Sequence, residues 1–105
     1  MAYYECSKGR ESEVIIYTYP RSGGTGTDTV NGIKDKPFWI FITSPVSGAL
    51  CSIEGKTNIL SCVMEPEGQS NNLRVYKLIP ATTGECTYAW STSSPYANRV
   101  LLKIE

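Results

Sequence analysis

The sequence predicts an all-β domain, an antiparallel β-sandwich of about eight to nine strands. Short apolar runs recur along the chain, and turns rich in Gly, Pro, Asn and Ser separate them. This rhythm is typical of antiparallel strands and leaves almost no room for a helix. A single flat sheet of so many strands would leave one face uncovered. We therefore expect two packed sheets, with a small closed β-barrel as the alternative.

In the first half of the chain we expect strands at 3–7, 13–19 and 36–43, and a small hairpin at 28–34. Residues 13–19 are rich in the β-branched and aromatic side chains that favour strands. Gly and Ser dominate residues 21–27, which we interpret as a flexible loop. Asn31-Gly32 is a preferred pair for a type I′ turn. Residues 36–43 are apolar at successive positions, which predicts a central strand covered on both faces.

The pattern in the second half of the chain predicts a β-meander, in which consecutive strands pair with one another. Its expected strands span 49–54, 59–65, 72–79, 85–92 and 98–104, and loops at 55–58, 66–71, 80–84 and 93–97 join them. We find no internal repeat and no linker. The 105 residues are close to the commonest domain size, so we expect residues 1–105 to form one domain.

Four cysteines, Cys6, Cys51, Cys62 and Cys86, allow two interpretations. They are buried thiols, which behave as small core residues, or they form two disulfides. If residues 55–58 form a four-residue hairpin loop, Cys51 lies opposite Cys62, at the short cross-strand distance of paired residues. Cys6 and Cys86 then remain as the second pair.

Catalytic and metal-binding patterns are missing from the sequence. The chain has no histidine, which removes the commonest general base and metal ligand. No C-x-x-C spacing suggests zinc. Asp28 and Asp35 are the only aspartates, and Glu54, Glu65, Glu67 and Glu85 fall at strand ends or in loops, where carboxylates are usually solvated. We expect no enzymatic activity, no metal and no cofactor.

Charge and hydropathy narrow the classes of partner. Ten basic and ten acidic residues cancel and are spread along the chain, so no basic patch favours nucleic acid. No segment approaches the roughly 20 apolar residues of a membrane span, and we expect no membrane insertion. Residues 1–6 have no basic or apolar signal region. Two locations fit this pattern. The protein belongs to a virion or cytoplasmic assembly, or it is secreted and its signal has been removed.

Aromatic side chains are the remaining signal, with seven tyrosines and two tryptophans. Trp39, Tyr88 and Trp90 have apolar or Cys neighbours on the same side of their strands, so we expect them in the core. Tyr17 and Tyr19 share one side of their strand, and Tyr96 lies in the turn at 93–97. Tyrosines are enriched at interfaces, so these three are our candidate binding residues.

We therefore predict a non-catalytic module that acts by protein–protein contact or self-assembly within a larger assembly. Candidate settings are a phage tail or capsid, or a bacterial surface appendage. The alternative is a secreted, disulfide-bonded module that binds carbohydrate or acts as an inhibitor. Both hypotheses rest on the residues alone, because a fold class does not determine a function.

Overall fold

A computed structural model describes residues 14–19, 24–44, 50–65 and 73–104. The described residues form eight strands and no helix. The strands are β1 (Val14–Tyr19), β2 (Gly24–Gly32), β3 (Phe38–Thr43), β4 (Cys51–Thr57), β5 (Ile59–Met64), β6 (Leu73–Pro80), β7 (Gly84–Thr92) and β8 (Asn98–Ile104). The strand expected at 3–7, and Cys6 with it, lies outside the described residues.

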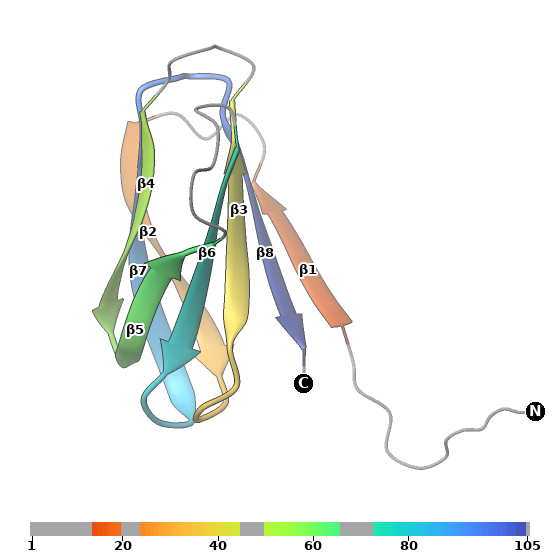
Figure 1. Cartoon of the computed structure of the whole chain (residues 1–105), viewed down its shortest axis with the longest axis vertical. Coiled ribbons are helices and arrows are strands. Elements are labelled where there is room, and N and C mark those ends of the chain that lie inside the picture. Colours follow the sequence, from red (N-terminus) through yellow and green to blue (C-terminus); the bar gives the residue numbers. More distant parts are fainter. Residues whose placement is uncertain (1–13, 20–23, 45–49, 66–72, 105) are drawn as a thin grey trace, which may run out of the picture.

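The strands form two antiparallel sheets packed as a sandwich (Figure 1). The large sheet has five strands in the order β1-β8-β3-β6-β5, and the small sheet has three in the order β2-β7-β4. The predicted β-sandwich is confirmed, and the alternative barrel is not the fold. The strand at 36–43 is also confirmed as central, because β3 pairs with β8 on one side and β6 on the other. The expectation that both of its faces are covered is wrong, because the second sheet lies against one face only, and the side chains on the other face are only half-buried.

The core lies between the two sheets. Alternate residues of each strand point inward, as the pleat of a β-strand requires. From the large sheet these include Phe38, Ile40, Ile42, Tyr76, Leu78 and Leu101, and from the small sheet Val30, Cys51, Ile53, Cys86 and Tyr88. Tyr88 is fully buried and Trp90 packs against this core, as expected. The expectation for Trp39 is wrong, because it points away from the core.

The segment that we interpreted as a glycine-rich loop is mostly strand. Residues 24–32 form β2 and pair with β7 over their whole length. Gly26 lies opposite Trp90, and a Cβ there would come 2.7 Å from the indole ring. This glycine provides room for a large neighbour rather than flexibility. The short turn falls at Lys34-Asp35, not at Asn31-Gly32: Lys36 N donates to Ile33 O at 2.9 Å, and Asp35 has a positive φ of 66°.

The predicted meander is wrong beyond the β5–β6 hairpin, because consecutive strands change sheets. The chain passes from the small sheet to the large one after β4, returns at β7, and crosses again at β8. Cys51 and Cys62 therefore lie on strands that pair with different neighbours, β7 and β6. Alternation of side chains identifies a strand but does not say which sheet it joins.

Candidate functional site

The outward side of the large sheet is apolar. Because Phe38, Ile40 and Ile42 point into the core, the residues between them point outward. The strand register continues the outward rows onto the neighbouring strands. We call these side chains the apolar face: Val14, Ile16, Trp39, Phe41, Val63, Leu73, Val75, Ile79, Val100, Leu102 and Ile104.

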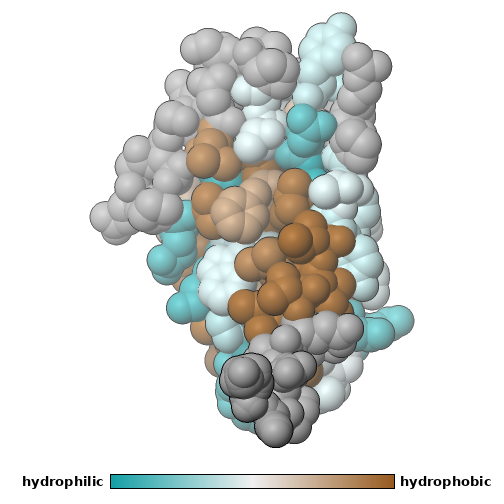
Figure 2. Space-filling view, turned by 90° about the vertical axis from the view of Figure 1, so that its right-hand side faces the viewer, coloured by the Kyte–Doolittle hydropathy of each residue, from teal (hydrophilic) through white to brown (hydrophobic). Residues whose placement is uncertain are grey.

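Much of the apolar face is open to solvent. Val14 and Ile16 on the edge strand β1 are 57% and 58% exposed, and Val63 on the opposite edge is 48% exposed. Leu73 and Ile104 are also exposed. Figure 2 looks at the β1 side of the molecule and shows hydrophobic side chains gathered into one continuous patch. Contiguous apolar surface of this kind is typical of interaction sites, so the apolar face is the candidate site.

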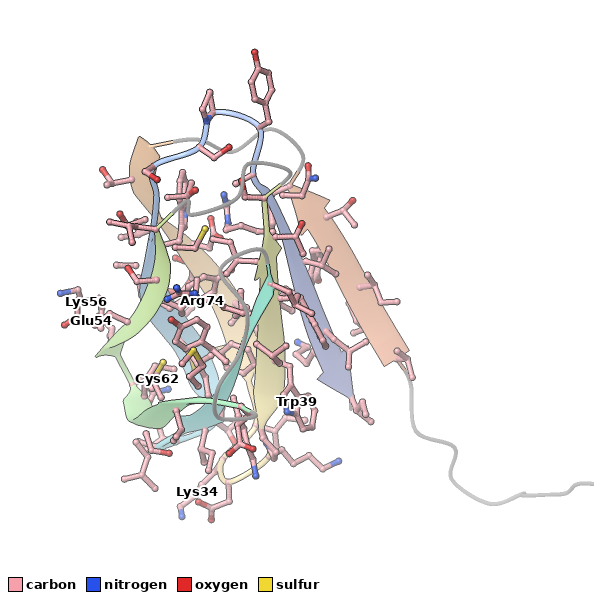
Figure 3. The ribbon with its side chains drawn as sticks, turned by 45° about the horizontal axis from the view of Figure 1, so that its top comes forward. Lys34, Trp39, Glu54, Lys56, Cys62 and Arg74 are labelled. Carbon is pink, nitrogen blue, oxygen red and sulfur yellow. The ribbon has the colours of Figure 1, made fainter. Side chains whose placement is uncertain are left out.

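A notch of about 210 Å³ opens beside the apolar face, lined by Lys36, Pro37, Trp39 and Ile104. Trp39 lies near the ends of β3 and β8 (Figure 3), and its ring forms one wall of the notch. Three of the four lining residues are apolar. The notch is large enough to receive an aliphatic or aromatic side chain from a partner.

The outward side of the small sheet has the opposite chemistry. Its register places Thr25, Ser91 and Ser52 in one row and Thr27, Ala89 and Glu54 in the next. Glu54 and Lys56 project from β4 into solvent (Figure 3) and form an exposed ion pair at 3.3 Å. A shallow hollow of about 330 Å³ lies over these residues. The two outer surfaces of the sandwich therefore differ sharply in polarity.

Two of the three candidate tyrosines lie together, on the inward side of β1. Tyr17 and Tyr19 line a cavity of about 200 Å³ between the large sheet and β2, with Thr29, Asn31 and Lys103 opposite or beside them. Lys103 is buried and donates a hydrogen bond from Nζ to the carbonyl of Asn31. The sequence paired these tyrosines correctly. The exposed apolar strip on β1, however, is Val14 and Ile16 on its other side.

A buried charged cluster joins the two sheets next to this cavity. Arg99 of β8 donates from Nε and Nη2 to the two carboxylate oxygens of Asp28 on β2, at 2.9 and 3.0 Å. Its guanidinium lies between the rings of Tyr19 and Trp90, 4.4 and 3.9 Å from their centroids. The Tyr88 hydroxyl donates a hydrogen bond to Asp28 Oδ2, with 2.6 Å between the two oxygens. The cluster is a structural bridge, and its paired charges leave no general base exposed.

Burial and the Asp28 carboxylate change the acidity of the two tyrosines in this cluster. The pKa of Tyr88 is raised far above its ordinary value, first by burial and then by its hydrogen bond to Asp28. The pKa of Tyr19 is raised by burial and by the negative charge of Asp28. Both phenols therefore stay neutral and act as hydrogen-bonding and stacking groups.

Tyr96 lies apart from the other two tyrosines, in the β7–β8 connection, and is 53% exposed. Its backbone N donates to the Ser94 hydroxyl at 3.2 Å, which helps to shape the turn. The sequence placed Tyr96 in a turn at 93–97, and the structure has a turn there. The structure does not bring Tyr96 into the cavity that Tyr17 and Tyr19 line.

The cysteines that the structure describes, Cys51, Cys62 and Cys86, are free thiols. Cys51 donates to the Thr92 hydroxyl at 3.4 Å, which ties β4 to β7. Burial raises the pKa of the Cys62 and Cys86 thiols, so both stay protonated and unreactive. The Cys51–Cys62 disulfide is not formed, and for the Cys6–Cys86 pair the structure describes Cys86 alone, as a thiol.

Sequence reasoning missed the apolar face and the Asp28–Arg99 pair. The signal for the face was present: residues 36–43 are apolar on both sides, and Val100, Leu102 and Ile104 alternate along residues 98–104. The structure supplies one covering layer for β3, the small sheet. The signal for Asp28 was hidden, because it becomes inward-facing only once residues 24–32 are known to be a strand. Asp28 then lies two residues before the buried Val30, on the same side of the strand.

Within the described ranges, no group of three or more His, Cys, Asp or Glu side chains is placed to hold a metal ion. The same ranges contain no helix with the length and hydropathy of a membrane span. No family model, curated protein or solved structure matches this chain.

Proposed function

We propose that this protein is a non-catalytic binding or structural module that acts by protein–protein contact through the apolar face. One observation carries the proposal: a central strand that is apolar on both sides has a covering sheet on only one of them. Burying apolar surface is favourable by roughly 25 cal/mol per Å². A partner surface that covers the face would therefore gain stabilisation that the isolated chain lacks.

The composition of the face supports a protein partner. Lys77 is the one charged side chain among the outward residues within the described strands of the large sheet. Interface centres are likewise depleted in charge and enriched in aromatic residues. Phe41 lies on the central strand of this surface, and Trp39 lies on the same strand near its beginning. A virion, a tail or a bacterial surface appendage remains our predicted setting for such a module.

Site-specific photo-crosslinking tests this function. A photoreactive amino acid replaces Ile16 on the apolar face, and a matched variant carries it at Thr25, an exposed position on the polar outer surface of the small sheet. We expect covalent adducts with protein at Ile16, because a docked partner covers that side chain. If Ile16 gives no more adduct than Thr25 in the native assembly, the proposal is wrong.

A second candidate function is carbohydrate binding at the inter-sheet cavity. The observation in its favour is that Tyr17 and Tyr19 line a cavity of about 200 Å³ together with Thr29, Asn31 and Lys103, which offer hydrogen-bonding groups. Aromatic rings beside polar groups suit a sugar. Binding on a glycan array that Tyr17→Ala abolishes and Thr25→Ala preserves would support this candidate. An array with no binding would remove it.

A further inference from the structure

We propose that the partner of the apolar face is an acidic protein segment, which inserts an apolar side chain into the notch beside Trp39 and pairs carboxylates with Lys36 and Lys77. This inference rests on the proposed function and names the chemistry of the partner at the same surface. Two observations carry it: the apolar notch at the end of the face, and two neighbouring lysines without an acidic partner in the described part of the chain.

Lys77 lies within the apolar face. The strand register places it directly opposite Trp39 on one side and Val63 on the other, and all three side chains point outward. Residues opposed in this way have Cβ atoms about 4.5–5.5 Å apart. Lys77 is half-buried, so its aliphatic stem packs among these neighbours while its amine reaches water. The cation therefore stands inside the surface that a partner has to cover.

No carboxylate of the described residues neutralises Lys36 or Lys77. The ion pairs among these residues join Lys34 to Asp35, Lys56 to Glu54 and Arg99 to Asp28. Glu65 follows β5 directly, but its backbone N donates to Val75 O at 2.6 Å, which places it one outward row away from Lys77. It forms no ion pair with Lys77, so both lysines are available to an acidic group from outside the described part of the chain.

Covering the face requires such an acidic group. A partner that removes water from Lys77 leaves a buried cation, which is costly unless the charge is paired and hydrogen-bonded. Carboxylates make short, strong hydrogen bonds with ammonium groups. The outward residues within the described strands of the large sheet include no Asp or Glu. The same face of another copy would therefore not supply the carboxylate, and a different protein segment would.

The notch fixes where the apolar side chain of that segment lies relative to its carboxylates. The walls of the notch are Trp39, Pro37 and Ile104, and Lys36 completes the lining. Trp39, near the end of β3 (Figure 3), connects the notch to Lys77 on the neighbouring strand. A side chain in the notch thus has one cation in the lining and a second across from the indole. A segment with acidic residues on both sides of an apolar one matches this arrangement.

Binding of two synthetic peptides, followed by NMR, tests the inference. One peptide carries a leucine flanked on both sides by glutamates, and the other has glutamines in place of the glutamates. The Trp39 indole N–H signal reports binding at the notch, and Trp90, which packs against the core, is the reference. We expect the glutamate peptide to bind at least about tenfold more tightly, because charge-assisted hydrogen bonds are about twice as strong as neutral ones.

Variants of the lysines assign this preference to its source. The double change Lys36→Gln and Lys77→Gln should bring the two affinities to within about twofold of each other, because the coupling needs both partners. Lys56→Gln is the matched control on the polar outer surface of the small sheet and should keep the preference. Lys77→Arg keeps the charge and should also keep it. Because Lys36 is exposed and Lys77 is half-buried, all of these variants should keep the wild-type unfolding midpoint.

The outcomes separate the chemistry of the partner from the proposed function. Equal binding of the two peptides, binding of neither, or a preference that persists in the double variant overturns this inference. The proposed function stands in those cases if Ile16 still crosslinks to protein in the native assembly. A Trp39 signal that shifts with protein concentration alone would identify a second copy as the occupant and also overturn the inference. Absence of both peptide binding and the Ile16 crosslink removes both proposals.

Discussion

At the scale of single residues, Asp28 connects the two sheets through one buried carboxylate. Its carboxylate receives two hydrogen bonds from Arg99 and one from Tyr88, and these residues come from both sheets. The Arg99 side chain is 4% exposed and that of Asp28 is 12% exposed. Buried pairs of this kind add little net stability over apolar packing, yet removal of one partner leaves an uncompensated buried charge.

We therefore expect Asp28→Asn to lower the free energy of unfolding by about 3–5 kcal/mol. Urea unfolding monitored by tryptophan fluorescence measures the change, since Trp90 stacks on Arg99. Asp35→Asn is the matched control: it breaks the Lys34–Asp35 ion pair, whose side chains are 60% and 64% exposed, and should cost less than about 1 kcal/mol. Equal costs for the two variants would contradict the assigned role of Asp28.

At the scale of elements, the corner between β4 and β5 decides how the chain changes sheets. Asn58 stands there with a positive φ of 60°. Its side chain donates to the carbonyls of Thr82 and Glu85 at 2.9 and 3.2 Å and accepts from the backbone N of Thr82 at 2.9 Å. One side chain thus joins this corner to the β6–β7 turn.

Two substitutions at Asn58 separate its backbone role from its side-chain role. Asn58→Gly keeps the positive φ without strain and loses the hydrogen bonds, so we expect a loss of about 2–3 kcal/mol in the free energy of unfolding. Asn58→Ala loses the same bonds and adds about 1 kcal/mol of left-handed strain. Chemical unfolding of the two variants measures both effects. A near-neutral Asn58→Gly would show that the hydrogen bonds contribute nothing.

The elements also show how far the sequence predicts this fold. Strands at 13–19, 36–43 and in the second half were found because alternation of side chains is a local property. Strand β2 was missed because Gly26, which accommodates Trp90, resembles a loop glycine until its partner is known. The sheet order and the apolar face depend on register between distant segments, which no local pattern contains. The sequence predicts that Tyr17 and Tyr19 share one side of a strand. It does not predict the cavity that they line, because the other lining residues come from β2 and β8.

At the scale of the whole molecule, the raised pKa values of buried groups make stability depend on pH. Burial raises the pKa of the Cys86 thiol, and burial together with the hydrogen bond to Asp28 raises the pKa of the Tyr88 hydroxyl. Because the pKa of each group is higher in the folded protein, the same side chain loses its proton at a lower pH in the unfolded chain than in the folded one. The stabilisation is complete below the unfolded pKa values, about 8.5 for Cys and about 10 for Tyr, and is lost as the pH rises above them.

We expect the free energy of unfolding to fall above about pH 8.5, and more steeply above about pH 10, by roughly 1.4 kcal/mol per pH unit for each such group. Denaturant titrations between neutral and alkaline pH measure the slope. Tyr88→Phe should be less stable at neutral pH and lose stability less steeply above about pH 10, because one titrating group is removed. An unchanged slope would refute the linkage to Tyr88.

The difference in polarity between the two outer surfaces also limits the number of layers in an assembly formed through the apolar face. A partner that covers the apolar face would leave the hydroxyl groups and the Glu54–Lys56 ion pair of the small sheet facing water. A module with one apolar face would therefore accept a single layer of partner, whereas a module with two apolar faces would continue to stack.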